Sequence, residues 1–272
     1  AASDVYKRQH IIGVNQPLGQ MYGYVTDGLY QVSDFDYDEA TKTYTLKDGV
    51  PYSGKKTDVK PGMWKFKNVD GSEDNKITEN DKTVIGNAYP KFYGGINNTF
   101  TYKDFDLSIF LTYSFGNDVF NATKLTNTKT ALQNKNVLDI ANSSNRWVVV
   151  NKKGELITDP QEMADINKGK TVAAVYDNEI GDTYIHSWAV EDGSYLRIST
   201  ITLGYTFPKK WLSKAFISNL RLYCTLNNPF TITNYSGYDP EVSKESSILT
   251  PGIDDSSYPR SKGFVFGINL SL

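Results

Sequence analysis

The clearest hydrophobic pattern in this chain is a strict alternation along residues 262–272. Large apolar residues occupy every second position, namely Phe264, Phe266, Ile268, Leu270 and Leu272, and the positions between them carry Val265, Gly267, Asn269 and Ser271. Successive side chains of a β-strand point to opposite faces, so a period of two predicts a strand with one apolar face. An unpaired apolar edge promotes aggregation in water, whereas a transmembrane β-barrel pairs every edge and turns the two faces to lipid and lumen. The pattern therefore favours a barrel strand.

The same alternation recurs in two pairs of segments that short turns connect. The first pair flanks Lys103-Asp104 and the second flanks a turn at Pro208–Leu212; the segments are residues 97–102, 105–114, 200–207 and 220–227. Alternating segments joined in this way predict antiparallel hairpins. Asp106 falls on a polar face, which suits a hydrated lumen and would be costly in a dry core. Residues 21–31 are a weaker strand candidate, because Gly23 and Gly28 interrupt them.

Two long polar stretches separate the alternating segments, residues 117–185 and 233–261. Short helices are expected within the first stretch, near residues 128–141 and 159–168. Structureless connections of this length argue against a compact soluble domain. Outer-membrane barrels combine short periplasmic turns with long extracellular loops. We therefore place both hairpin turns on the periplasmic side and both long stretches outside the cell.

Composition narrows the class of protein further. The 272 residues hold 29 Lys and Arg against 31 Asp and Glu, a balance that gives no reason to expect a nucleic-acid partner. Mean hydropathy is −0.46 and no long apolar run occurs, which excludes a transmembrane helix but not barrel strands. Aromatic residues make up 13%, which fits either the interfacial girdles of a barrel or an aromatic-rich soluble β-sandwich. The predicted fold class is all-β.

Short blocks of residues spread over most of the chain resemble the SusC/RagA family of TonB-dependent outer-membrane transporters. One such block is Leu-Gly-Tyr-Thr-Phe-Pro at residues 203–208. The others lie at residues 18–24, 27–31, 61–66, 83–87, 90–92, 94–100, 113–118, 145–147, 190–197, 237–241 and 258–260. Their order and spacing carry the resemblance. It implies that the chain forms the C-terminal strands of a large antiparallel transmembrane β-barrel with long extracellular loops, a fragment of a 22-stranded barrel in the cell outer membrane.

The resemblance also implies a function and partners. It predicts TonB-dependent uptake of large nutrients, either glycans and oligosaccharides or peptides, without catalysis. The expected partners are a SusD-like surface lipoprotein, outer-membrane lipid, and TonB through an N-terminal part that is missing here. We expect residues 1–9 to be a non-native or unstructured start, and residues 10–272 to be the C-terminal part of the barrel, with the plug domain absent. The alternative is a soluble carbohydrate-binding or adhesion β-sandwich.

One acidic segment, residues 70–81, partly matches the calcium-binding loop of an EF-hand. Oxygen-bearing side chains fall at loop positions 1, 3, 5, 9 and 12, which are Asp70, Ser72, Asp74, Thr78 and Asp81. Asn75 stands where the loop usually has Gly, and Asn tolerates the left-handed backbone conformation. Another register would use Asn68, Asp70 and Asp74. Calcium is the candidate cofactor, and a solvated acidic turn is the alternative, because the Glu of position 12 is absent.

Two tryptophans, Trp147 and Trp188, lie near the predicted extracellular loops and are the candidate ligand-binding residues, with structural packing as the alternative. We predict no catalytic residues. Glu191-Asp192 cannot act as a carboxylate pair, because adjacent strand residues point to opposite faces. Asp239-Pro240-Glu241 has no accompanying base or nucleophile, so we expect it to shape a loop.

Overall fold

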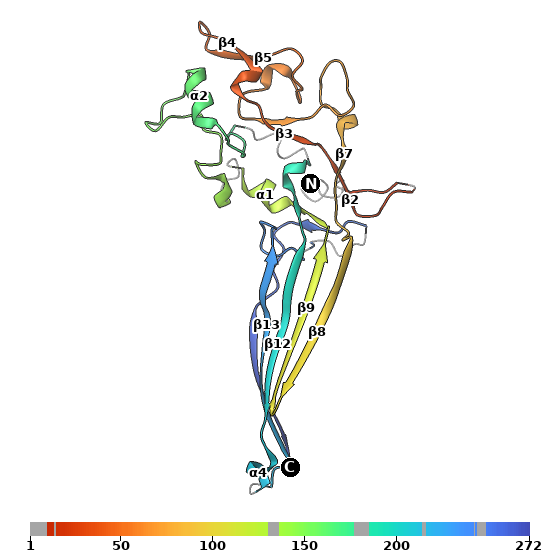
Figure 1. The fold of residues 1–272 in the computed structure, drawn as a ribbon. Coiled ribbons are helices and arrows are strands. Elements are labelled where there is room, and N and C mark those ends of the chain that lie inside the picture. The colour runs from red at the N-terminus through yellow and green to blue at the C-terminus, as the bar shows by residue number, and fades with distance from the viewer. Residues whose placement is uncertain are drawn as a thin grey trace.

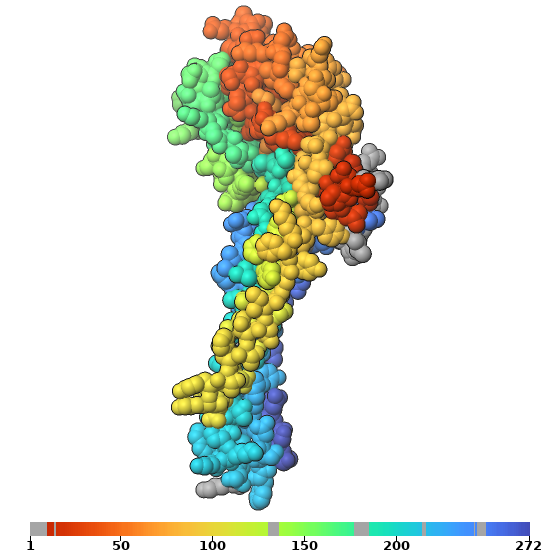
Figure 2. Space-filling model, turned by 45° about the vertical axis from the view of Figure 1, so that its right-hand side comes forward, coloured from red at the N-terminus to blue at the C-terminus, as the bar shows by residue number. Residues whose placement is uncertain are grey.

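The structure, a computed structural model, describes residues 10–13, 15–129, 136–176, 185–213, 216–241, 243 and 249–272. The chain divides into a long, narrow sheet and a wider lobe of short elements at one end of that sheet (Figures 1 and 2). The C-terminal residue and the short helix α4 (Lys209–Leu212) lie at the end away from the lobe (Figure 1). The predicted start, residues 1–9, lies outside the described residues.

Five strands form the long sheet in the spatial order β15-β13-β12-β9-β8, and each neighbouring pair is antiparallel. They are β8 (Phe92–Tyr102), β9 (Phe105–Phe115), β12 (Tyr195–Thr206), β13 (Asn219–Thr233) and β15 (Gly263–Ser271). Both predicted hairpins are confirmed, β8–β9 around Lys103-Asp104 and β12–β13 around α4. Lys103 adopts a φ of 54°, as tight hairpin turns require.

The register gives the sheet one apolar and one polar face. Residues that pair directly across neighbouring strands share a face, and one continuous apolar row consists of Ile109, Ile201, Leu226 and Phe264. The adjacent row on the other face consists of Ser108, Thr202, Thr225 and Val265. Within that row the hydroxyl oxygens of Thr202 and Thr225 are 2.9 Å apart. The facing predicted for residues 262–272 is therefore confirmed along β15.

A β-bulge in β12, between Ile198 and Thr200, exchanges the faces of the residues beyond it. On the α4 side of the bulge, odd-numbered residues such as Ile201 lie on the apolar face. On the lobe side, Ile198 pairs with Leu111 of β9, so even-numbered residues take that face. Arg197 consequently lies on the polar face, although a regular strand would have placed it beside Ile201 on the apolar face.

No core covers the long sheet within the described residues. None of its residues belongs to the three clusters of buried hydrophobic side chains, and Phe266 and Ile268 are 74% and 69% exposed. A β-sandwich would bury this apolar face under a second sheet, which the described chain does not supply. Lipid covers such a face in a membrane barrel, so the fold favours the barrel over the sandwich.

The lobe consists of short strands and helices. Its strands are β1 (His10–Ile11), β2 (Gln20–Gly23), β3 (Thr26–Leu29), β4 (Phe35–Asp38), β5 (Thr43–Leu46), β6 (Trp64–Phe66), β7 (Thr83–Asn87), β10 (Asp118–Asn121), β11 (Val190–Asp192) and β14 (Ile253–Asp254). Its helices are α1 (Ala122–Asn127) and α2 (Pro160–Asn167), with 3-10 turns η2 (Val32–Asp34), η3 (Lys56–Asp58), η4 (Glu79–Asp81), η5 (Asp139–Ala141) and η6 (Ser187–Ala189). No helix in the described part of the chain is long and apolar enough to span a membrane.

The weaker predictions had mixed outcomes. Residues 21–31 do not form one strand, because β2 pairs with β7 whereas β3 pairs with β6. The helix expected near 159–168 is confirmed as α2. The Asp159 carboxylate caps it by accepting hydrogen bonds from the amides of Gln161 and Glu162. For the helix expected near 128–141, residues 130–135 lie outside the described residues, and the remainder holds only η5.

Buried side chains from distant segments hold the lobe together. The largest cluster includes Trp64 and Phe66 from β6, Trp147, and Met163 from α2. A small sheet joins the lobe to the long sheet: β10 follows β9 almost directly, and it pairs with β11 and, in parallel, with β14. Because β14 belongs to the connection between β13 and β15, this sheet fastens both long connections to each other.

Candidate functional site

An ion pair spans the polar face near the end of the sheet away from the lobe. Arg221 on β13 reaches across β12 to Asp106 on β9, with an Nε–Oδ1 distance of 2.9 Å and an Nη2–Oδ2 distance of 2.5 Å. Gly204 lies between them on β12, and a Cβ there would clash with both charged groups. Both side chains are about one quarter exposed, 25% for Arg221 and 29% for Asp106. The polar-face placement predicted for Asp106 is confirmed by this register.

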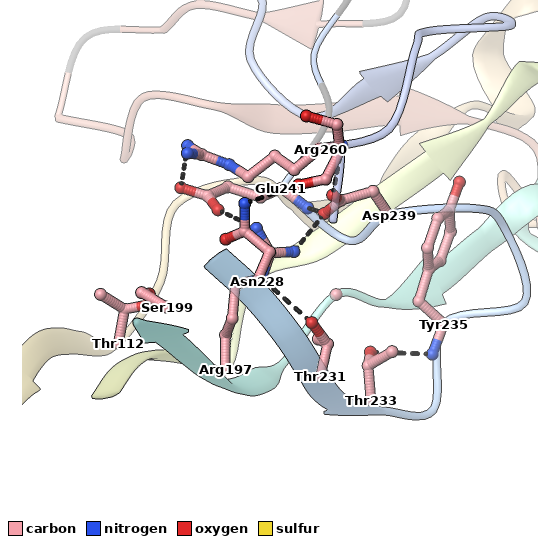
Figure 3. A network of polar contacts seen from close by, with 12 residues as sticks. Thr112, Arg197, Ser199, Asn228, Thr231, Thr233, Tyr235, Asp239, Glu241 and Arg260 are labelled. Carbon is pink, nitrogen blue, oxygen red and sulfur yellow. Dashed lines mark hydrogen bonds and ion pairs between the residues drawn. The ribbon is translucent and has the colours of Figure 1, made fainter. Parts of the chain in front are cut away.

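A second polar network, which we call the clasp, lies where the sheet meets the lobe (Figure 3). Arg197 of β12 donates from Nη2 to Asp239 Oδ1 at 2.6 Å, from Nη1 to Glu241 Oε2 at 2.8 Å, and from Nε to the hydroxyl of Thr231 at 3.1 Å. Arg260 closes the network with a 2.8 Å bond to Glu241 Oε1. The clasp thus binds Asp239, Glu241 and Arg260 of the β13–β15 connection to the barrel wall.

The centre of the clasp is buried and its rim is open to solvent. The side chains of Arg197 and Asp239 are 3% and 5% exposed, whereas that of Arg260 is 57% exposed. Burial alone would raise the pKa of Asp239. However, the backbone amides of Glu241 and Arg260, together with the Arg197 guanidinium, donate to its carboxylate and hold that pKa below its ordinary value. Asp239 is therefore ionised at neutral pH.

A third set of contacts fastens the same connection to β11 and α1. Glu191 accepts hydrogen bonds from the amide and the hydroxyl of Ser236, at 2.9 and 2.8 Å, and pairs with the Lys124 ammonium at 3.0 Å. Burial opposes ionisation here as well, but these donors hold the pKa of Glu191 below its ordinary value. The hydroxyl of Tyr235 donates to Asp254 of β14 at 2.6 Å.

Both tryptophans that were predicted to bind ligand pack against other side chains of the lobe. Trp147 is 1% exposed, and its indole lies against Gly62, where an added Cβ would clash with the ring. Trp188 is partly exposed. Its ring centroid lies 4.9 Å from the ring centroid of Trp64 and 4.2 Å from the Lys124 ammonium. Trp147 is a buried member of one core cluster and Trp188 packs against that cluster, and their ligand-binding role stays a prediction.

His186 lies between the rings of Trp64 and Phe66, with centroids 4.9 and 5.3 Å away. Its Nδ1 is 2.8 Å from the Thr26 hydroxyl. Burial lowers the pKa of His186 to about 3, and the positive charges of Lys129 and Lys124 add to the effect. The imidazole is therefore neutral at physiological pH and serves in packing.

The candidate calcium residues fold into a tight acidic turn. Asp81 is fully buried, and its carboxylate accepts hydrogen bonds from the amides of Val69 and Thr78, at 2.8 and 2.7 Å. Asp70 and Asp74 are exposed and accept hydrogen bonds from amides two residues further on. Asn75 has the left-handed φ, 54°, that its position predicted.

The acidic side chains of this turn do not converge on one point. Among the described residues there is no group of three or more His, Cys, Asp or Glu side chains placed to hold a metal ion. Calcium binding would therefore require Asp70 and Asp74 to turn inward, and it stays a prediction.

The clasp is the arrangement that the sequence did not reveal. Its charged residues Arg197, Asp239, Glu241 and Arg260 all occur in blocks that carried the resemblance, yet nothing in those blocks indicated that the four residues pair. The pairing depends on the β12 bulge and on the path of a long loop, and neither leaves a periodic signal in one sequence.

The chain is similar in sequence to known receptors, although no family model matches it. It is 29% identical to TonB-dependent receptor P3 of Formosa agariphila over 98% of the chain, and 28% identical to TonB-dependent receptor SusC of Bacteroides thetaiotaomicron over 75%. These matches cover 23% and 17% of the two receptors, so the chain spans about a fifth of their length.

Solved structures support the same fold. The RagAB peptide importer in its open-open state superposes with a TM-score of 0.59 at 18% identity, covering 93% of this chain and 22% of that one. A further structure of the RagAB peptide transporter gives a TM-score of 0.57 at 17% identity, covering 97% and 23%. The two-faced antiparallel sheet thus has the fold of part of the wall of a large transmembrane β-barrel, as predicted.

The sequence relatives of this chain are therefore TonB-dependent receptors, a class of outer-membrane proteins, and its fold is that of part of such a barrel. Within that class the chain is similar in sequence to SusC, and its fold matches that of RagAB, as the sequence blocks predicted. The predicted division into residues 1–9 and 10–272 stays a prediction.

Proposed function

We propose that this chain is part of the barrel and extracellular loops of a transporter that imports large nutrients across the outer membrane, with energy delivered through TonB. The observation that carries the proposal is the two-faced sheet: its apolar face has no protein cover in the described chain, and its opposite face carries hydroxyls and an ion pair suited to a hydrated lumen. The sequence relatives are TonB-dependent receptors.

The loops suggest how such a transporter would be organised at the cell surface. The clasp and the small β10 sheet hold the lobe in a fixed position above the wall, where it can support a SusD-like surface lipoprotein. In this proposal the wall bounds the path, the lobe contacts substrate and lipoprotein, and no residue performs covalent chemistry. Glycans and peptides are both retained as substrate classes.

The proposal is tested in the source bacterium with the complete gene. A deletion strain and a complemented strain are offered fluorescently labelled starch, xylan and pectin oligosaccharides and casein peptides. Uptake of at least one probe should require the gene and should stop when a protonophore collapses the proton gradient. Growth on glucose is the control. Equal uptake of every probe with and without the gene would refute transport of these substrates.

The proposed lipoprotein partner is tested separately by affinity purification of the tagged complete receptor from detergent-solubilised outer membranes. A surface lipoprotein should co-purify in amounts close to equimolar. Its absence, under conditions that keep the barrel folded, would contradict the partner but not the transport.

A further inference from the structure

A pocket of about 450 Å³ opens at the part of the lobe furthest from α4, between the β4–β5 hairpin and the segment around α2. Its volume lies within the range of small-ligand sites. Hydrogen bonds from two tyrosines join the two walls. The Tyr37 hydroxyl donates to the carbonyl of Thr158 at 2.8 Å, and the Tyr176 hydroxyl donates to the carbonyl of Pro61. Because these bonds cross from one segment to the other, the pocket is formed before any ligand arrives.

The inner surface of the pocket is aromatic and aliphatic. The rings of Tyr37 and Tyr44 lie 4.8 Å apart, and Leu156 contributes a side chain that is 72% exposed. The Tyr44 hydroxyl oxygen is buried and has no hydrogen-bond partner among the described residues. A ligand with an apolar side chain would cover Leu156, and an acceptor that reaches Tyr44 would satisfy this hydroxyl.

The charged side chains that line the pocket are both lysines, and the Asp159 carboxylate outside the lining adds, after burial and Tyr37, to the raised pKa of Tyr44. The two lysines are Lys42 and Lys60, and neither has a carboxylate partner among the described residues. The Lys60 ammonium lies 5.7 Å from the centroid of the Tyr176 ring. No described lining residue is Asp, Glu, Asn, Gln or Arg. The pocket therefore favours an anionic ligand, and it lacks the planar polar side chains that would pair with the many hydroxyls of a sugar.

We propose that this pocket binds a peptide segment that carries an apolar side chain next to a carboxylate. The inference deepens the proposed function, because it assigns acidic peptides as a substrate class of the same receptor. The apolar side chain packs against the tyrosines and Leu156, while Lys42 and Lys60 pair with the carboxylate.

Binding is tested by calorimetry on the complete receptor in detergent, so that the result does not depend on transport. The probes are the acidic peptide acetyl-Leu-Asp-Leu-Glu-Leu, its neutral counterpart acetyl-Leu-Asn-Leu-Gln-Leu-amide, and maltohexaose. The variants are Lys60→Glu and Leu156→Asp. Lys67→Glu is the matched control, since this lysine is exposed and lies outside the pocket. Heat-modifiable migration on gels verifies that each barrel is folded.

The acidic peptide should bind the unaltered receptor. Its affinity should be about tenfold lower for Lys60→Glu and Leu156→Asp, and unchanged for Lys67→Glu. The neutral peptide should bind more weakly and respond less to Lys60→Glu. Absent binding of the acidic peptide, or equal affinity in all variants, overturns the inference. Binding of maltohexaose that Leu156→Asp weakens would make the pocket a glycan site and would also overturn it. A negative result here leaves the uptake assay, and with it the proposed transport, unaffected.

Discussion

Replacing Arg197 with methionine should release the β13–β15 connection from the barrel wall. The change keeps an unbranched side chain but removes three donated hydrogen bonds and the charge opposite Asp239. Breaking one partner of a buried ion pair typically costs about 3–5 kcal/mol. Asp239 keeps two backbone donors, the amides of Glu241 and Arg260, at 3.0 and 3.1 Å, so we take the lower end, about 3 kcal/mol.

The assay is amide hydrogen exchange on the complete receptor, followed in peptides that cover residues 235–241 and 253–260. Exchange from a locally opened state follows the free energy of opening. A loss of about 3 kcal/mol corresponds to roughly 150-fold faster exchange. Peptides from β9 should be unchanged, which would show that the barrel itself remains folded.

Arg260→Leu is the matched control, because it removes the other arginine of the clasp. Its side chain is 57% exposed, and an exposed ion pair contributes at most about 1 kcal/mol, or about fivefold in exchange. The backbone amide of residue 260 still donates to Asp239 in this variant. Equal effects of the two substitutions, or no effect of Arg197→Met, would refute the argument that burial gives the central pair its strength.

The stability of the clasp should also depend on pH, and it should fall only at acidic pH. The pKa of Asp239 is lower in the folded receptor than in the unfolded chain, so its contribution is fully present above the unfolded value of about 3.9 and is lost as pH falls through the folded value. Exchange in residues 235–241, corrected for intrinsic rates, should stay constant from pH 8 to about pH 5 and increase only below about pH 4. An increase centred near pH 6 would point to a different group.

Three further predictions test the sheet and the acidic turn. Phe266→Arg on the lipid face should cost about 2–4 kcal/mol and reduce folded receptor in the outer membrane, whereas Val265→Arg on the lumen face, opposite Thr225, should be tolerated; equal yields would contradict the assignment of the two faces. Gly204→Ala should displace the ion pair between β9 and β13 and lower the temperature at which the folded gel band is lost, while Gly263→Ala, where a Cβ meets no atom within 4 Å, should leave that temperature unchanged. EGTA should lower the melting temperature if residues 70–81 bind calcium; an unchanged value would refute calcium binding and leave Asp81 as a hydrogen-bonding residue of the turn.

The alternation of residue types predicted the long strands well, because lipid and lumen impose opposite demands on successive side chains. β9 and β15 follow the predicted pattern along their whole length. The alternation predicted for residues 200–207 is confirmed, but it does not reach the bulge in β12, where one extra residue exchanges the faces without changing composition. The pattern gave little information on the lobe, whose strands are short and obtain their stability from contacts between distant segments such as β6 and α2.

The same bulge explains why Arg197, a charged residue, occupies a position that would face lipid if β12 alternated regularly. Arg197 must lie on the polar face to reach Asp239, whereas Ile198 and Ile201, on either side of the bulge, both lie on the face that contacts lipid. A regular strand cannot satisfy all three positions, because it would put Arg197 and Ile201 on one face. The bulge satisfies them together, and the connection that Arg197 holds is also paired through β14 to β10. The two long connections are thus joined to each other, and Arg197 fastens one of them to the wall, so a displacement of one connection should displace the other.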